Sequence, residues 1–210
     1  MIRIFLTTAA GIVLVAAAAQ PARAADAPDG LATATFASGC FWCTEKDFED
    51  VEGVAEAISG YTGGEVAKPS YEQVTFGDTG HVEAVQVRYD PEVVSYSELL
   101  EVYWRNVDFL DAGGQFCDRG PSYASAIFWH DAAQRDAALV DRERIAASGV
   151  FDRPVVTKIE EAGVFWPAED YHQDYYKKNP FRYQAYRWNC GREARLDELR
   201  AGLARLATGS

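Results

Sequence analysis

The segment at residues 81–89 (HVEAVQVRY) constrains the fold of this chain more than any other. Its apolar side chains recur largely at every second position, which is typical of a β-strand with one covered face. Asp90 and Pro91 follow directly, and proline cannot continue the hydrogen-bonded ladder of a strand. The chain must therefore build a sheet around this strand.

Strand-like and helix-like segments alternate along the rest of the chain. We expect further strands at residues 31–38, 54–61, 123–129 and 155–161. We expect helices at residues 40–52, 70–76, 97–106, 131–148 and 192–206, with Ser95 or Ser97 as the cap of the third. Strands that alternate with helices around one sheet predict a single α/β or α+β domain.

The N-terminus has the pattern of a secretory signal peptide. Arg3 precedes a mostly apolar stretch at residues 4–19, and residues 22–24 (ARA) provide a small-x-small exit. A membrane anchor is the alternative, but the stretch is short for a hydrocarbon core that needs about 20 residues. We expect a signal peptide at residues 1–24, a flexible leader at 25–30 and one domain at 31–210, mobile from about residue 180. This predicts a periplasmic or secreted protein with no membrane contact after cleavage.

The chain is strongly acidic. It carries 32 acidic and 20 basic side chains, a formal net charge of −12, and loss of residues 1–24, with two arginines and no acid, makes the charge −14. Nucleic acids and anionic membranes are bound through clusters of Lys and Arg. The composition therefore argues against both classes of partner.

The run GCFWC places Cys40 and Cys43 between a predicted strand and a predicted helix. A cysteine at a helix N-terminus meets the positive end of the helix dipole and free backbone N–H groups, which lower the pKa of the thiol. Since the thiolate is the attacking form, we predict that Cys40 is a nucleophile. Phe41 and Trp42 add apolar, polarisable surface suited to a methyl or thioether group.

Three other interpretations of this run are open. With four cysteines in an exported chain, Cys40 could belong to one of two structural disulfides. A zinc site is disfavoured because His81, His130 and His172 are scattered singly, so no metal is expected. A thioredoxin-type Cys-x-x-Cys is disfavoured because the intervening pair is aromatic, with neither Gly nor Pro.

Glu83 is a candidate general acid at the start of the alternating strand, within GDTGHVEAV. If it faces the covered side of the sheet, desolvation raises its pKa and lets it hold a proton near neutral pH. If it faces solvent, it is an ordinary surface carboxylate. The alternation alone leaves both faces open.

Two polar loops hold weaker candidates. Asp118 and Tyr123 lie in GGQFCDRGPSY, a loop that leads into a predicted strand, and site residues are often found in such loops. The run EDYHQDYY at residues 169–176 combines acids, a histidine and tyrosines. Either run alone is also typical of a surface loop.

Taken together and in order, these runs resemble the A-type peptide methionine sulfoxide reductases. The runs that carry the resemblance span roughly residues 33–199: GCFWC, GYTGG, PSYEQV, GDTGHVEAV, QFCDRGPSY and EDYHQDYYKKNP. The resemblance implies an α+β fold with a ferredoxin-like core, in which helices and long loops flank a mixed or antiparallel sheet. It also implies reduction of the S epimer of methionine sulfoxide, free or in peptides, with no metal or bound organic cofactor.

The same resemblance implies roles for individual residues. Cys40 would attack the sulfoxide sulfur, and Glu83 would protonate the departing oxygen, because this oxygen is a poor leaving group until it is protonated. The other residues would hold the substrate: Tyr71, Tyr123 and Asp118 at the oxygen, Phe41 and Trp42 at the methyl group, and Tyr183 as a further contact.

Attack would leave a sulfenic acid on Cys40, which a second cysteine converts to a disulfide for reduction by an external, thioredoxin-like dithiol. Some family members carry Gly-Tyr-Cys after the NP motif, but here the aligned residue is Gln184. We favour Cys190 as the resolving cysteine, because it lies in a C-terminal tail between Asn and Gly. Cys117 and Cys43 are alternatives, and a bond from Cys43 to Cys40 along one helix would need local distortion.

The combined prediction is an exported, monomeric enzyme that repairs oxidised methionine. Its partners would be peptides and proteins that contain methionine sulfoxide, and a thioredoxin-like reductant. Two alternatives from other classes remain. One is a general thiol–disulfide oxidoreductase that ignores methionine sulfoxide, and the other is a binding module with two structural disulfides.

Overall fold

The structure is a computed structural model that describes residues 30–208. The predicted signal peptide and nearly all of the predicted leader lie outside these residues. Within the described range, none of the helices combines the length and the apolar character that a membrane span requires.

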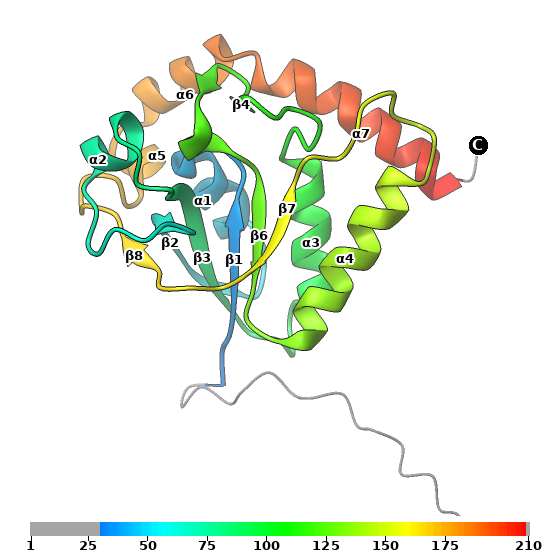
Figure 1. The fold of residues 1–210 in the computed structure, drawn as a ribbon, viewed down its shortest axis with the longest axis horizontal. Helices are drawn as coiled ribbons and strands as arrows, with labels where there is room; N and C mark the ends of the chain where they lie inside the picture. Colours follow the sequence, from blue (N-terminus) through cyan, green and yellow to red (C-terminus); the bar gives the residue numbers. More distant parts are fainter. Residues whose placement is uncertain (1–29, 209–210) are drawn as a thin grey trace, which may run out of the picture.

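The centre of the fold is a six-stranded mixed sheet with the strand order β7-β6-β1-β3-β2-β8 (Figure 1). Its four central strands pair antiparallel with one another: β6 (Ala126–Trp129), β1 (Ala32–Ala37), β3 (Val82–Tyr89) and β2 (Val54–Thr62). At the edges, β7 (Lys158–Glu161) runs parallel to β6, and β8 (Trp166–Pro167) pairs with β2. Helices α1 (Phe41–Glu49) and α3 (Tyr96–Arg105) link these strands in the order of the predicted ferredoxin-like core.

The remaining elements pack around this core. They are α2 (Tyr71–Phe76), the hairpin of β4 (Gly114–Gln115) and β5 (Asp118–Arg119), a 3₁₀ turn (Pro121–Tyr123), α4 (Ala132–Ala146), α5 (Tyr175–Lys178), α6 (Pro180–Asn189) and α7 (Arg192–Thr208). In Figure 1, α6 and α7 follow one another along the top of the molecule. The segment from about residue 180 is therefore helical, and its mobility stays a prediction.

An aromatic stack joins α1 and α3 to the sheet. The ring of Phe36 on β1 lies 4.6 Å from that of Phe48 on α1 and 5.4 Å from that of Tyr103 on α3, and all three are buried. Because successive strand residues face opposite sides, Ala37 packs on the other face of the sheet, with Phe128 of β6. The helix whose N-terminus carries Cys40 is thus packed against the sheet through buried aromatic side chains.

Two of the boundaries that differ from the sequence prediction lie at candidate residues of the sequence analysis. The predicted strand at 123–129 begins only at Ala126, because Pro121 starts a 3₁₀ turn and lacks the N–H group that a strand ladder needs. The predicted helix at 40–52 begins at Phe41, with Cys40 as its N-cap. Ser95 is confirmed as the cap of α3, where its hydroxyl accepts a hydrogen bond from the backbone N–H of Glu98.

Candidate active site

Cys40 lies directly after a turn that only glycine can form. Gly39 has a φ of 85°, and a Cβ at this position would lie 2.4 Å from the Cβ of Gln115. Both constraints exclude larger residues. The turn ends β1 and places the Cys40 thiol at the floor of a cavity, where the residue is 6% exposed.

The cavity has a volume of about 230 Å³ and is built from residues of six separate elements. Its lining consists of Cys40, Phe41, Trp42, Tyr71, Glu83, Asp118, Tyr123 and Tyr186. All but Tyr186 were predicted from the sequence. The predicted contact Tyr183 does not line the cavity: it is buried on α6, where its hydroxyl accepts a hydrogen bond from Arg187.

Glu83 faces the covered side of the sheet and is 1% exposed. One carboxylate oxygen accepts a hydrogen bond from the backbone N–H of Phe41 at 3.0 Å. Burial raises the pKa of Glu83 to about 8, and the nearby Asp118 carboxylate acts in the same direction, while the bond from Phe41 opposes both. Glu83 therefore holds a proton at neutral pH, as expected for the covered alternative.

The expected lowering of the Cys40 pKa is wrong. Burial raises the pKa of Cys40, and so do the bond that its thiol makes to Cys43 and the charges of Glu83 and Asp118. The helix N-terminus does not offset this, because its first N–H group is bonded to Glu83.

Cys43 is the more acidic thiol of the pair. The hydrogen bond from Cys40 lowers the pKa of Cys43 to about 7, against the effect of burial, and the guanidinium groups of Arg192 and Arg187 lower it further. Cys40 lies at the N-cap, outside the helix proper, and its thiol is in contact with that of Cys43, while the local distortion expected for a disulfide between them stays a prediction.

Two phenols face Glu83 across the cavity. Burial raises the pKa of Tyr71 and of Tyr123, and the charge of Glu83 raises both further. The Tyr123 hydroxyl lies within hydrogen-bonding reach of that of Tyr71. Both hydroxyls are therefore protonated at physiological pH and can donate to an oxygen bound between them and Glu83.

Comparisons with known proteins agree with this geometry. The model of the family described as peptide methionine sulfoxide reductase matches residues 32–202. The peptide methionine sulfoxide reductase MsrA of Bacillus licheniformis is 52% identical over 165 residues, which cover 79% of this chain and 91% of that protein. MsrA of Bacillus subtilis is 50% identical over 165 residues, covering 79% and 93%. The chain belongs to the A-type peptide methionine sulfoxide reductases.

Solved structures of such reductases share the fold. Mxr1 of Saccharomyces cerevisiae in its reduced form matches with a TM-score of 0.66 at 33% identity, over 73% of this chain and 88% of that one. Methionine sulfoxide reductase A of Corynebacterium diphtheriae matches with a TM-score of 0.64 at 30% identity, over 77% of each chain.

In this reductase an aromatic wall closes one side of the cavity. The Trp42 ring stacks on Tyr175 at 3.7 Å, and its Nε1 donates to Nδ1 of His172 at 3.0 Å. The wall is held from behind by Glu45, whose buried carboxylate accepts hydrogen bonds of 2.6 Å from the Asp174 backbone N–H and the Ser59 hydroxyl. The predicted loop at residues 169–176 thus supplies His172 and Tyr175 to this wall.

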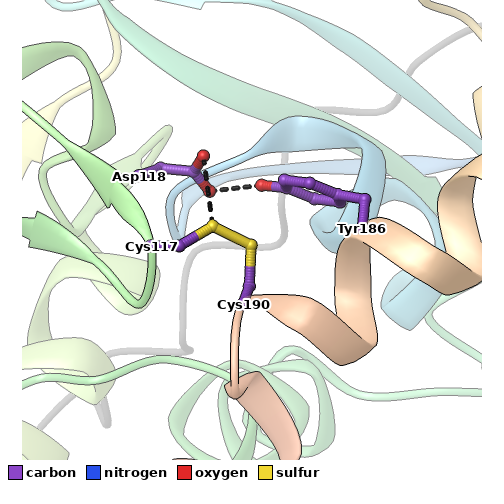
Figure 2. The surroundings of a disulfide bond; sticks show 4 residues. All are labelled: Cys117, Asp118, Tyr186 and Cys190. Carbon is purple, nitrogen blue, oxygen red and sulfur yellow. Dashed lines mark hydrogen bonds between the residues drawn. A yellow bond between two sulfur atoms is a disulfide. The ribbon is translucent and has the colours of Figure 1, made fainter.

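A disulfide joins Cys117 in the β4–β5 hairpin to Cys190 at the end of α6 (Figure 2). Cys40 and Cys43 are free thiols, so Cys40 does not belong to a structural disulfide in this structure. Figure 2 shows the Asp118 carboxylate between the Cys117 sulfur, at 3.9 Å, and the hydroxyl of Tyr186, which donates to it.

Two groups of possible metal ligands occur among residues 30–208. In the first, Asp118 lies beside Cys117 and Cys190, whose sulfurs are bonded to each other. The second contains Glu45, Glu49 and Asp174. Lys177 already pairs with two of these acids, at 2.7 Å from Glu49 and 2.8 Å from Asp174. Neither group has a free set of ligand atoms.

Four side chains at the site were not predicted from the sequence: Glu45, His172, Tyr175 and Tyr186. Glu45 lies four residues before Glu49 on a helix, where it resembles any surface acid. His172 and Tyr175 lie in the run EDYHQDYY. The resemblance to the family pointed to this segment, but it did not predict which side chains contact one another. Tyr186 carries no local signal, because its position depends on how α6 crosses the cavity.

The raised pKa of Glu83 predicts a pH-dependent stability. Glu83 has a pKa of about 8 in the folded protein and an ordinary value of 4.5. Between these values the folded protein binds one more proton than the unfolded chain. The contribution of Glu83 to the free energy of unfolding therefore falls as pH rises from 5 to 8. We expect the free energy of unfolding of the wild type, relative to Glu83→Gln, to fall by up to about 1.4 kcal/mol per pH unit in this window. Urea unfolding of both proteins measures it, and a difference that is flat from pH 5 to 8 would contradict the assignment.

Proposed function

We propose that this protein reduces the S epimer of methionine sulfoxide, free or in peptides and proteins, to methionine. The observation that carries the proposal is the cavity in which the Cys40 thiol lies beside a protonated Glu83 and two phenols. A sulfoxide presents an electrophilic sulfur, a basic oxygen and an apolar methyl group. The cavity offers a group of matching chemistry to each of the three.

In the first step the Cys40 sulfur forms a bond to the sulfoxide sulfur. Glu83 gives its proton to the oxygen, and the hydroxyls of Tyr71 and Tyr123 donate hydrogen bonds to it, which makes the oxygen a better leaving group. The S–O bond of the sulfoxide breaks, the Cys40 sulfur takes the oxygen in a new S–O bond, and the bond between the two sulfurs breaks to release methionine. The Cys40 sulfur loses two electrons and the sulfoxide sulfur gains them, so the products are methionine and a sulfenic acid.

The Cys40 thiol must lose its proton when it attacks. Cys43 is the acceptor that the geometry supports, because it already accepts the hydrogen bond from Cys40 and has two guanidinium groups nearby. Phe41 and Trp42 hold the methyl group of the substrate. Asp118 supports the site through Tyr186, and the role predicted for Tyr183 stays a prediction.

A second cysteine then condenses with the sulfenic acid, with release of water and formation of a disulfide. While Cys190 is bonded to Cys117, we infer that Cys43 performs this step, since it is the free thiol in contact with Cys40. In protein whose Cys117–Cys190 bond has been reduced, Cys190 remains our predicted resolving cysteine. An external dithiol of the thioredoxin type then reduces the new disulfide by exchange and becomes a disulfide itself.

Export to the periplasm or beyond is part of the proposal. Its support is the sequence of residues 1–24, which has the charged start, the apolar stretch and the small-x-small exit of a signal peptide. The mass of the protein purified from a periplasmic extract tests it. A chain that begins at Ala25 is expected, and a chain that retains residues 1–24 would contradict cleavage.

Single-turnover reduction of each sulfoxide epimer of a blocked methionine tests the activity. We expect the S epimer alone to react, no reaction with Cys40→Ser, and with Glu83→Gln a rate about 10²- to 10⁴-fold lower, as is typical for loss of a general acid. In the wild type this step is expected to slow above about pH 8, where Glu83 loses its proton.

Glu45→Gln is the matched control, because it also removes a buried carboxyl of raised pKa but lies outside the cavity lining. The rate of sulfoxide reduction by Glu45→Gln should still decline above pH 8, as in the wild type. If Glu83→Gln reacts at the wild-type rate, Glu83 is not the acid. If a fully reduced wild type reduces neither epimer, the proposed activity is wrong.

The resolving step is tested by counting thiols after excess substrate in the absence of reductant. Protein with the Cys117–Cys190 bond intact is expected to form one methionine per chain and to lose both free thiols. Cys43→Ser is expected to retain a sulfenic acid that a cyclic diketone traps. A Cys117→Ser/Cys190→Ser protein serves as control and should behave like the wild type. If the Cys43→Ser protein, with the Cys117–Cys190 bond intact, forms a disulfide, the assignment of Cys43 is wrong.

A further inference from the structure

Tyr186 is the one residue of α6 that lines the cavity. Its hydroxyl donates a hydrogen bond to the Asp118 carboxylate and lies within hydrogen-bonding reach of the Cys40 sulfur. Its ring meets the edge of Trp42 at 5.8 Å, with an angle of 78° between the planes. The phenol is therefore held between an acceptor and the sulfur that performs the first step of the proposed function.

The Cys117–Cys190 disulfide links the same two segments a second time. Cys117 directly precedes Asp118, and the backbone N–H of Cys190 donates to the carbonyl of Tyr186 at 3.0 Å, one helical turn away. Figure 2 shows both links side by side, the covalent one between Cys117 and Cys190 and the hydrogen bond between Asp118 and Tyr186. A movement of the end of α6 away from the hairpin would break both.

We propose that Tyr186 is a further catalytic residue, whose hydroxyl donates a hydrogen bond to the Cys40 sulfur once that sulfur is a thiolate, and that the Cys117–Cys190 disulfide holds the hydroxyl in place. A hydroxyl has one proton to donate. It bonds to Asp118 while Cys40 is protonated and turns to Cys40 when the thiolate forms. The catalytic role of Tyr186 rests on the proposed function, but its stabilisation of the Cys40 thiolate does not.

The surroundings of Cys40 make such a donor necessary. The titratable groups that face it are Cys43 from α1, Glu83 from β3, Asp118 from β5, Tyr71 from α2, Tyr123 from the 3₁₀ turn and Tyr186 from α6. None of them is a cation. A buried thiolate at this position is stabilised only by hydrogen bonds, and hydrogen bonds to a charged atom are the stronger kind.

The disulfide makes this hydrogen bond sensitive to reduction. When a dithiol reduces the Cys117–Cys190 bond, two electrons and two protons pass to the two sulfurs and the dithiol becomes a disulfide. The end of α6 is then held at the hairpin by the Tyr186–Asp118 bond and by the contact of the Arg192 guanidinium with the Phe116 ring. The hydroxyl of Tyr186 becomes less strictly positioned over Cys40, and the thiolate forms less readily.

The test measures the pH dependence of Cys40 alkylation by iodoacetamide, without sulfoxide, in a Cys43→Ser background where Cys40 is the sole free thiol. We expect Tyr186→Phe to lower the thiolate population of Cys40 at a given pH by about tenfold, a shift of about one pH unit, as for loss of a hydrogen bond to a charged group. Tyr176→Phe is the matched control, because it removes a phenol that donates to a carboxylate, that of Glu49, outside the cavity. It should leave the profile unchanged.

The disulfide is tested by adding Cys117→Ser/Cys190→Ser to the same background. We expect loss of the disulfide to shift the pH profile of Cys40 alkylation to higher pH, as Tyr186→Phe does. In the protein without the disulfide, Tyr186→Phe should shift this profile less than it does in the protein with the disulfide. Circular dichroism and thermal melting check that each variant is folded. An unchanged profile in folded Tyr186→Phe would overturn the catalytic role, and strictly additive shifts would overturn the role of the disulfide. Failure of the proposed function would leave these profiles unaffected, because no sulfoxide is present.

Discussion

The hydrogen bond from the backbone N–H of Phe41 to Glu83 is the contact on which the site depends. It ties the first turn of α1 to the central strand β3 and so sets the distance between nucleophile and acid. It also opposes the burial that raises the pKa of Glu83, and it engages an N–H group that would otherwise favour a thiolate at Cys40. One bond therefore couples the protonation states of both groups that carry the chemistry.

Two acidic side chains outside the cavity lining, the buried Glu45 and the half-buried Glu169, act as anchors. Glu45 holds the backbone of Asp174, and Glu169 accepts hydrogen bonds from the Tyr61 hydroxyl and the Tyr71 backbone N–H, each at 2.9 Å. Both acids connect the loop after β8 to the sheet and to α1 or α2. The aromatic wall at Trp42 is thus positioned by acidic side chains outside the cavity lining, and its geometry is set by the folded chain before binding.

Much of the fold could be predicted from the sequence, because its strands and helices carry local signals. The alternation at 81–89, the Ser95 cap and the Gly39 turn depend on residues near in the sequence. The departures have long-range causes. Tyr123 lies in a 3₁₀ turn, not a strand, and the choice between Tyr183 and Tyr186 depends on which side of α6 faces the cavity.

The size of the cavity has a consequence for the proteins that would be repaired. Cys40 is 6% exposed at the floor of a space of about 230 Å³, so a methionine sulfoxide must extend its whole side chain to reach it. A residue packed inside a helix bundle or a sheet cannot do so until its surroundings open locally, at a free-energy cost that varies from site to site. Among damaged methionines, those on mobile stretches would be restored first, and the order of repair would follow the local stability of the damaged protein.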